Sequence, residues 1–354
     1  MTDECPKCRE NAEKGCYFCG ACGRSLEDIR VIGHHPVYEP DNRGARPGPV
    51  SIILAISCIF ILLVAVFEVI TLLVHSVDVF GFLADKVYGF IVIVPFPEVL
   101  FRLEGGALQA YWVILILAIV ASAVIAIKKF ADTAKSSGDI ARPDAIENTA
   151  AFWVCISMGV MMLINFISVF IVIMTGTEIT TPSLGSEAEQ MFLLADASVW
   201  EEIIARVLYI GVPMTVISLA ITRKKESLKC LFGGFGMSLT AVALILISSA
   251  VFGLAHSPGW DGQTWKIMTT GIMGVLIGYI FVRFGLYAAI LLHFITDYLS
   301  SFTWMGVGGF EAVITLALLG VGLVALYYIF ARLKGYVGVE NAIPNFRNSY
   351  IKSD

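Results

Sequence analysis

The feature that most constrains this chain is a succession of apolar runs between residues 51 and 332. Each run has about 20 residues, the length that an α-helix rising 1.5 Å per residue needs to cross about 30 Å of hydrocarbon. Of the 354 residues, 57% are hydrophobic and 15% charged, whereas about 25% are charged in soluble domains. The sequence therefore predicts an all-α polytopic membrane protein with about eight transmembrane helices. The eight runs are roughly 51–75, 108–130, 150–175, 199–222, 231–256, 267–283, 285–303 and 310–332.

The Lys and Arg residues predict an orientation. When the eight runs are joined in order, most basic residues fall on one side and an acidic loop falls on the other. The positive-inside rule then places both termini in the cytoplasm. The segment Val87–Leu103 is also apolar, but it contains Pro95 and Pro97. We therefore expect it to be a short interfacial or re-entrant element rather than a ninth span.

Five of the eight cysteines lie near the N-terminus, between Cys5 and Cys22. Cys5/Cys8 and Cys19/Cys22 form two C-x2-C pairs, which predict a tetrahedral structural zinc site. Cys16 and Cys19 form a third such pair, and an unmetallated or redox-active cluster is the alternative. We expect a zinc ribbon that recruits a protein partner but no nucleic acid, because acidic residues offset its basic ones. The predicted organisation is a ribbon at 1–30, a linker at 31–50, a membrane domain at 51–335 and a cytoplasmic tail at 336–354.

Ionisable residues interrupt the later apolar runs, where a charged side chain costs at least about 2.5–3.5 kcal/mol near the bilayer centre. Glu202 and Arg206 are spaced i, i+4 on one helical face and should pair, which leaves Glu201 for another task. His293 and Asp297 also share a face. The candidate catalytic residues are Glu201, Glu202, Arg206, His256, His293 and Asp297, with Phe252 one turn before His256.

Such a set of carboxylates and imidazoles suits the activation of water. A buried carboxylate or a His acts as a general base, and a second His stabilises an oxyanion. Two His and one Glu could instead bind a catalytic zinc with an open water position. The non-catalytic alternatives are that the two acids face the aqueous loop, that His256 is interfacial and that the His293–Asp297 pair is structural. No G-x-S-x-G nucleophile motif is present, which argues against covalent catalysis.

The three motifs Glu201-Glu202-x3-Arg206, Phe252-x3-His256 and His293-x3-Asp297 resemble those of the CAAX protease and bacteriocin-processing (CPBP/Abi) family of intramembrane proteases. This family includes type II CAAX prenyl endopeptidases, and the resemblance covers roughly residues 190–305. It implies that Glu201 and His256 activate water and that His293 and Asp297 shape the oxyanion site. It also implies that Glu202 and Arg206 hold Glu201 in place, and it leaves open whether catalysis requires a metal.

Three positions depart from the family pattern. Ala205 and Val207 stand where an aromatic residue and Gly are frequent, and Asp297 stands where Asn is typical. An ionised Asp cannot donate to an oxyanion, so Asp297 would have to be protonated or orient His293. The resemblance implies a peptide or membrane-protein substrate, which could be prenylated. In the predicted topology Glu201 and His256 lie toward the extracytoplasmic side, which favours a membrane-embedded or exported peptide. A silent scaffold or immunity protein, or a proton-coupled transporter, are the alternatives.

Overall fold

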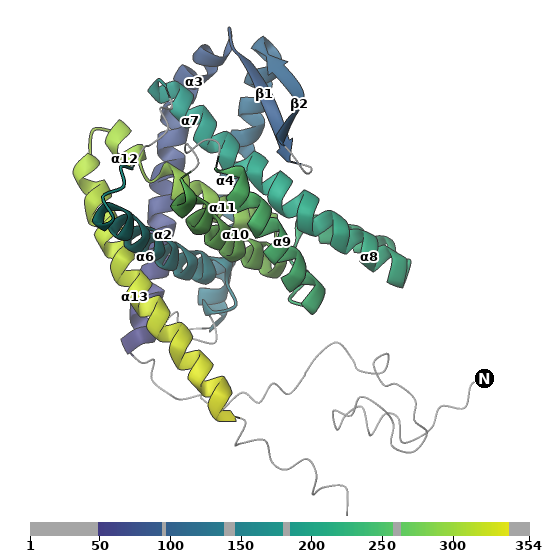
Figure 1. Ribbon diagram of the computed structural model, residues 1–354, viewed down its shortest axis with the longest axis vertical. Helices are drawn as coiled ribbons and strands as arrows, with labels where there is room; N and C mark the ends of the chain where they lie inside the picture. The colour runs from purple at the N-terminus through teal and green to yellow at the C-terminus, as the bar shows by residue number, and fades with distance from the viewer. Residues whose placement is uncertain (1–48, 94–96, 138–145, 180–184, 258–262, 340–354) are drawn as a thin grey trace, which may run out of the picture. The chain divides into compact units, whose positions relative to one another are not determined.

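The computed structural model describes residues 49–93, 97–137, 146–179, 185–257 and 263–339 (Figure 1). The chain divides between Arg46 and Pro47. The predicted zinc ribbon with its four cysteines, nearly all of the linker and most of the predicted tail lie outside the described residues. The membrane part is described from Pro49 onward.

Within the described part, helices predominate. In chain order they are α2 (Pro49–Val74), α3 (Ser76–Leu83), α4 (Gly105–Ser137), α6 (Ala150–Met174), α7 (Glu187–Asp196), η1 (Ala197–Glu201), η2 (Ile203–Gly211), α8 (Val212–Thr222), η3 (Lys225–Phe232), α9 (Leu239–Ala255), α10 (Thr264–Phe284), α11 (Leu286–Tyr298), α12 (Ser301–Trp304) and α13 (Gly308–Val339).

Six helices of the described part are long and apolar enough to cross a membrane. They are Val50–Val74, Gly105–Ser137, Ala150–Met174, Glu187–Ile221, Trp265–Phe284 and Gly308–Ala331. Their outward faces carry large apolar side chains that are exposed in the absence of lipid, such as Leu63, Leu117 and Leu316. The prediction of a polytopic, predominantly helical membrane protein is confirmed, and the chain is an integral membrane protein.

Two of the eight predicted spans are shorter than expected. The run 231–256 yields only α9, because the 3₁₀-helix η3 and three glycines with positive φ (Gly233, Gly234 and Gly236) precede it. The run 285–303 divides into α11 and the four-residue α12. Both α9 and α11 are apolar, but they have 17 and 13 residues. In the part of the chain that the structure describes, the eight predicted runs therefore correspond to six long helices and two shorter ones.

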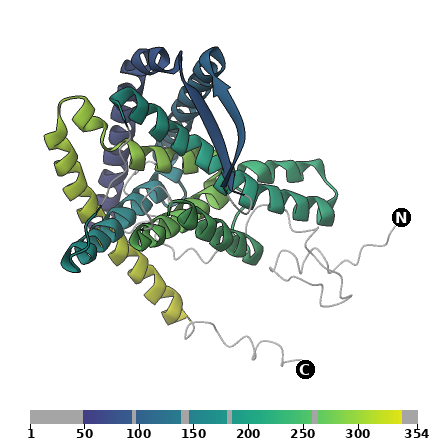
Figure 2. The same ribbon diagram turned by 45° about the horizontal axis from the view of Figure 1, so that its top comes forward.

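The segment expected to be an interfacial or re-entrant element forms a β-hairpin. Strands β1 (Val87–Ile93) and β2 (Pro97–Glu104) pair antiparallel (Figure 2). The β-branched and aromatic residues of β1 favour an extended strand, and the Phe90 ring is buried. Side chains of the helix that carries the Glu pair hold the hairpin: the indole of Trp200 donates to the Ile91 carbonyl at 2.9 Å, and the Tyr209 hydroxyl donates to that of Ile93.

The hairpin is also held near its first residues. The hydroxyls of Tyr88 and Tyr111 donate to the two carboxyl oxygens of Asp196, at 2.9 and 2.6 Å. Burial raises the pKa of the Tyr88 hydroxyl, and the Asp196 carboxylate raises it further. Tyr88 therefore stays protonated and continues to donate to Asp196 throughout the physiological pH range.

Candidate active site

The Glu pair lies in the middle of a long apolar helix that is partly π-helical. The candidate span Glu187–Ile221 comprises α7, η1, η2 and α8, with i→i+5 hydrogen bonding in η1 and η2. π-helical turns inside α-helices are frequent at functional sites. Glu201 ends η1 and Glu202 separates it from η2, so the winding of the helix changes at the two carboxylates.

Glu202 and Arg206 form a buried ion pair. Nε of Arg206 lies 3.0 Å from Oε2 of Glu202, and both side chains are fully buried. Nη1 of Arg206 donates to the Ser248 hydroxyl of α9 at 2.9 Å, and this hydroxyl donates to the Ala205 carbonyl at 2.5 Å. The Arg206 guanidinium therefore links the helix of the Glu pair to α9. Pairing and hydrogen bonding are what allow such charges to remain buried.

His293 of α11 lies between two carboxylates. Its Nδ1 lies 2.8 Å from Oε1 of Glu202, and its Nε2 lies 3.3 Å from Oδ2 of Asp297. A carboxylate accepts, so Nδ1 carries the proton of this bond. The Glu202 carboxylate thus fixes the orientation of the imidazole and directs Nε2 toward Glu201, whose Oε2 lies 3.9 Å away.

His256, which caps the end of α9, approaches Glu201 from another side. Its Nε2 lies 3.7 Å from Oε2 of Glu201. Its Nδ1 lies 2.8 Å from the carbonyl oxygen of Phe252, which only accepts, so the Nδ1–H donates and the neutral ring has a lone pair on Nε2. Oε2 of Glu201 has no hydrogen-bond partner among the described residues. Two imidazole nitrogens thus face one carboxylate oxygen at distances too long for direct hydrogen bonds.

The exposure of the side chains separates two groups. Glu201 is 35% exposed, His256 23% and Asp297 20%, whereas Glu202 and Arg206 are not exposed at all. His293 is 4% exposed and lies between the two groups. Glu201, His256 and Asp297 are therefore the more accessible residues of the site, although Oε2 of Glu201 is itself buried, and the Glu202–Arg206 pair supports them from within.

The end of α9 is held in place by close packing. A Cβ atom on Gly253 would lie 2.6 Å from the Ile267 carbonyl oxygen of α10, so only Gly permits this approach. The Phe252 ring packs edge-on against His256, with centroids 4.7 Å apart, and the Arg206 guanidinium lies 5.0 Å from its centroid. His256 is therefore positioned by the carbonyl and ring of Phe252 and by the close approach of α9 to α10 at Gly253.

These motif residues lie within a region that is similar to a known protein family. Residues 190–299 match the family model "Type II CAAX prenyl endopeptidase Rce1-like". The match supports the CAAX protease family and a protease activity. It covers α7 to α11 and includes all six candidate residues. No curated protein and no solved structure matched the chain.

All six candidate residues of this Rce1-like region lie close together, although four helical segments carry them. The predicted Glu202–Arg206 pair is present. The Glu202 carboxylate binds Arg206 and His293, and the expectation that Glu202 and Arg206 hold Glu201 in place stays a prediction. Adjacent residues on a helix point about 100° apart, so Glu202 points to α11 while Glu201 points to His256.

Other residues near the site were not singled out from the sequence. Glu68 of α2 is fully buried, interacts electrostatically with Asp297, and neither of its carboxyl oxygens has a hydrogen-bond partner in the described part. It is an acid inside an apolar run, so the criterion that identified Glu201 would have found it. Lys266 of α10 lies within electrostatic range of Glu201 and Asp297. The sequence did not indicate a role for Ser248, because Ser is common in apolar helices.

No group of three or more His, Cys, Asp and Glu side chains is arranged to hold a metal ion in the described part of the chain. Cys5, Cys8, Cys19 and Cys22 lie outside it, so the zinc ribbon remains a prediction. Cys58 and Cys155 are buried free thiols and Cys230 is a half-buried one.

Proposed function

We propose that the protein is an intramembrane endopeptidase that hydrolyses a peptide bond near or within the membrane. The observation that carries the proposal is the convergence of two imidazole Nε2 atoms on Oε2 of Glu201, at 3.7 and 3.9 Å. Groups at such distances form no direct hydrogen bond, and a water bound to both would complete the contact. The water would lie between a carboxylate and an imidazole lone pair, both of which accept its protons.

In the proposed reaction, Glu201 and His256 act on the water. The carboxylate of Glu201 takes a proton as the water oxygen bonds to the scissile carbonyl carbon. Nε2 of His256 accepts the second hydrogen of the water as a hydrogen bond and so orients its lone pair. When the C–N bond breaks, the proton held by Glu201 passes to the leaving amine. General acid–base catalysis of this kind contributes about 10²- to 10⁴-fold.

His293 is suited to stabilise the oxyanion. Its Nδ1–H is held by Glu202, and its Nε2 faces the same space as Glu201 and His256. A proton on Nε2 would donate to the carbonyl oxygen as negative charge develops there. Asp297 would orient this imidazole rather than donate to the oxyanion itself, because its Oδ2 lies 3.3 Å from Nε2 of His293.

The substrate class follows from the surroundings of the site. The candidate residues lie inside a bundle whose outer helices present exposed apolar side chains, such as Leu246 and Ile247 of α9, so the substrate would be a peptide or a membrane protein that approaches within the bilayer. A prenylated peptide remains one member of this class.

The N-terminal ribbon would bind one structural zinc through Cys5, Cys8, Cys19 and Cys22 and would recruit a protein partner. Both termini would be cytoplasmic.

The test is cleavage by the full-length chain reconstituted in lipid vesicles with farnesylated and membrane-spanning peptides. Glu201→Ala and His256→Ala should each lower the cleavage rate by about 10²- to 10⁴-fold. Glu187→Ala is the matched control, because Glu187 is an exposed acid on the same long helix. Unchanged cleavage in both site variants would refute the mechanism. No cleavage of any peptide by the wild type would favour the silent-scaffold alternative.

A further inference from the structure

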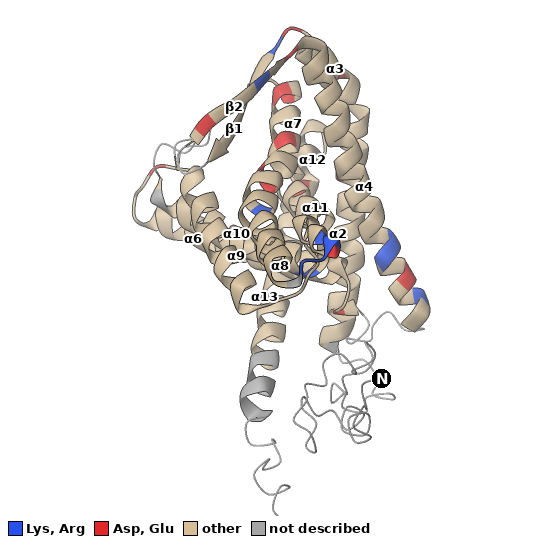
Figure 3. Ribbon diagram, turned by 90° about the vertical axis from the view of Figure 1, so that its right-hand side faces the viewer, with Lys and Arg blue, Asp and Glu red and all other residues tan. Residues whose placement is uncertain are grey.

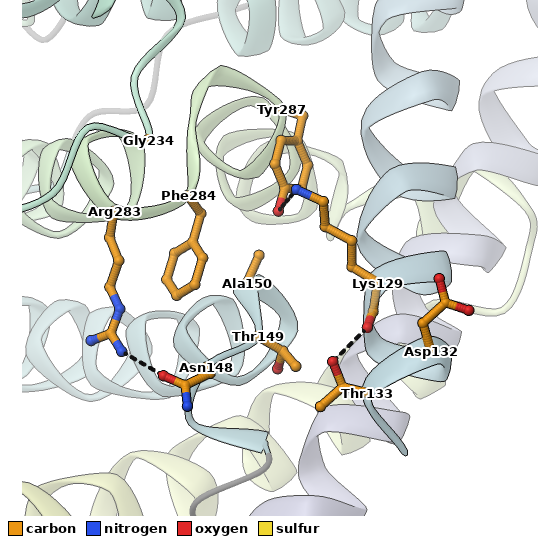
Figure 4. Close-up of a pocket in the computed structure, with 10 residues that line it drawn as sticks. All are labelled: Lys129, Asp132, Thr133, Asn148, Thr149, Ala150, Gly234, Arg283, Phe284 and Tyr287. Atoms are coloured by element: carbon orange, nitrogen blue, oxygen red, sulfur yellow. Dashed lines mark hydrogen bonds between the residues drawn. The ribbon is translucent and has the colours of Figure 1, made fainter. Parts of the chain in front are cut away.

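A cavity of about 440 Å³ lies between the ends of α4, α6, α10 and α11. Figure 4 shows Lys129 of α4 and Arg283 of α10 on opposite sides of the start of α6. None of the six candidate catalytic residues lines this cavity. It is a separate polar region that takes no part in the proposed protease reaction.

The two cations at the cavity have only neutral partners. Arg283 donates to the Tyr279 hydroxyl at 2.5 Å and, over longer distances of 3.4 and 3.5 Å, to the Glu147 carbonyl and the Asn148 side chain. Nζ of Lys129 lies 3.3 Å from the Tyr287 hydroxyl. Among the described residues neither cation forms an ion pair with a carboxylate. Asp132 also lines the cavity but is exposed and contacts neither cation.

The start of α6 adds donors to the same cavity. Thr149 caps this 25-residue helix, and its hydroxyl accepts the N–H of Phe152. The N–H of Ala150, which lines the cavity, has no acceptor among the described residues. The first N–H groups of a helix lack intrahelical acceptors, and the helix dipole favours an anion there. Two cations and a helix start therefore converge on one space that is large enough for a polyatomic anion.

The position of the cavity indicates the source of the anion. Figure 3 shows basic residues at the end of α4 that is remote from the β-hairpin, and Lys128, Lys129 and Lys135 belong to this part of the helix. The cavity opens at the ends of three helices that are long enough to cross a membrane. Tyr287 also lines it, and Tyr is enriched at membrane interfaces. Basic pockets between membrane helices bind anionic lipid headgroups.

We propose that this cavity binds the phosphate group of an anionic phospholipid headgroup. Lys129 and Arg283 neutralise the phosphate from two sides, and the start of α6 donates to its oxygens. The acyl chains extend along the apolar faces of the neighbouring helices. The bound lipid joins the end of α4 to the junction of α10 and α11, and α11 carries His293 and Asp297.

The test is native mass spectrometry of the delipidated full-length protein, titrated with phosphatidylglycerol or with phosphatidylcholine. We expect a saturable adduct with phosphatidylglycerol and only weak, non-saturating adducts with phosphatidylcholine. Lys129→Gln should weaken the phosphatidylglycerol adduct about fivefold, the contribution of one Lys or Arg near an anionic lipid. Lys128→Gln is the matched control, because Lys128 is its exposed neighbour and does not line the cavity.

A second variant tests the site while it leaves Arg283 and the packing around Arg283 unchanged. Thr133→Glu places a carboxylate at the cavity edge, removes no cation and should abolish the adduct. Equal adducts with the two lipids, or equal effects of Lys128→Gln and Lys129→Gln, would overturn the proposal. Displacement of the lipid by an equal concentration of inorganic phosphate would also overturn it, since the ligand would then be a soluble anion.

Discussion

Nδ1 of His293 lies 2.8 Å from Oε1 of Glu202, a residue that is 91 positions earlier in the chain. This hydrogen bond joins the helix of the Glu pair to α11. The same Glu202 carboxylate binds Arg206 at 3.0 Å and is fully buried. Glu202 is therefore the residue on which both the ion pair and the orientation of His293 depend.

Glu202→Gln should lower stability more than most substitutions. The change leaves the Arg206 guanidinium buried without a counter-charge, and breaking a buried ion pair by removing one partner costs about 3–5 kcal/mol. Thermal unfolding of the purified protein in detergent measures the loss. The double substitution Glu202→Leu with Arg206→Met should recover most of the stability but not the activity, because His293 loses its acceptor. A double variant that is as unstable as the single one would contradict this account.

Ser248→Ala should destabilise the link between α9 and the helix of the Glu pair. The Ser248 hydroxyl accepts from Nη1 of Arg206 at 2.9 Å, and loss of this partner costs about 1.5–3 kcal/mol because the donor is charged. Ser249→Ala is the matched control, since the equally buried Ser249 hydroxyl donates only within its own helix, to Ile245. Equal shifts of the unfolding temperature in the two variants would show that the bond to Arg206 contributes nothing specific.

Gly253→Ala should separate α9 from α10 and displace His256. The added Cβ would lie 2.6 Å from the Ile267 carbonyl oxygen, and overpacking of this kind costs about 1–3 kcal/mol. Because His256 is three residues further on, cleavage should fall as well. Gly320→Ala is the control, since a Cβ there meets nothing within 4 Å. Full activity and stability of the Gly253→Ala protein would be inconsistent with the packing described.

Asp297→Asn and Asp297→Ala should differ in activity. Asn keeps a carbonyl oxygen of the same size near Nε2 of His293, which Oδ2 of Asp297 approaches to 3.3 Å. Asp297→Ala removes this contact, and the loss of one hydrogen bond of about 1.4 kcal/mol slows cleavage about tenfold. The comparison of kcat for the three proteins measures the effect. Loss of activity in Asp297→Asn as large as in Asp297→Ala would mean that the negative charge itself is required.

The N-terminal cysteines lead to a prediction about metal content. The purified full-length chain should hold one zinc ion, measured by atomic emission after dialysis against metal-free buffer. Cys8→Ser and Cys22→Ser should lose it, whereas Cys16→Ser should keep it, because Cys16 lies outside the two preferred pairs. Cys230→Ser is the control from the membrane part. Retention of zinc in Cys22→Ser and its loss in Cys16→Ser would identify Cys16/Cys19 as the second pair.

The sequence predicted the parts of the site that depend on local spacing. Glu202 and Arg206 are four residues apart on one helix, so their pairing follows from helical geometry alone. The contact of Glu202 with His293 depends on how two distant helices pack, and no local pattern contains that information. The hairpin was missed for a related reason: a short apolar segment fits a membrane-associated helix as well as a strand.

The length and burial of α11 have a consequence for the supply of water to the site. Its 13 residues span about 20 Å, whereas the hydrocarbon core is about 30 Å thick. None of its side chains is exposed, so protein rather than lipid surrounds it. Water is a co-substrate of peptide hydrolysis. Water would therefore reach His293 and Asp297 between the neighbouring helices, and it would have less than the full thickness of the membrane to cross.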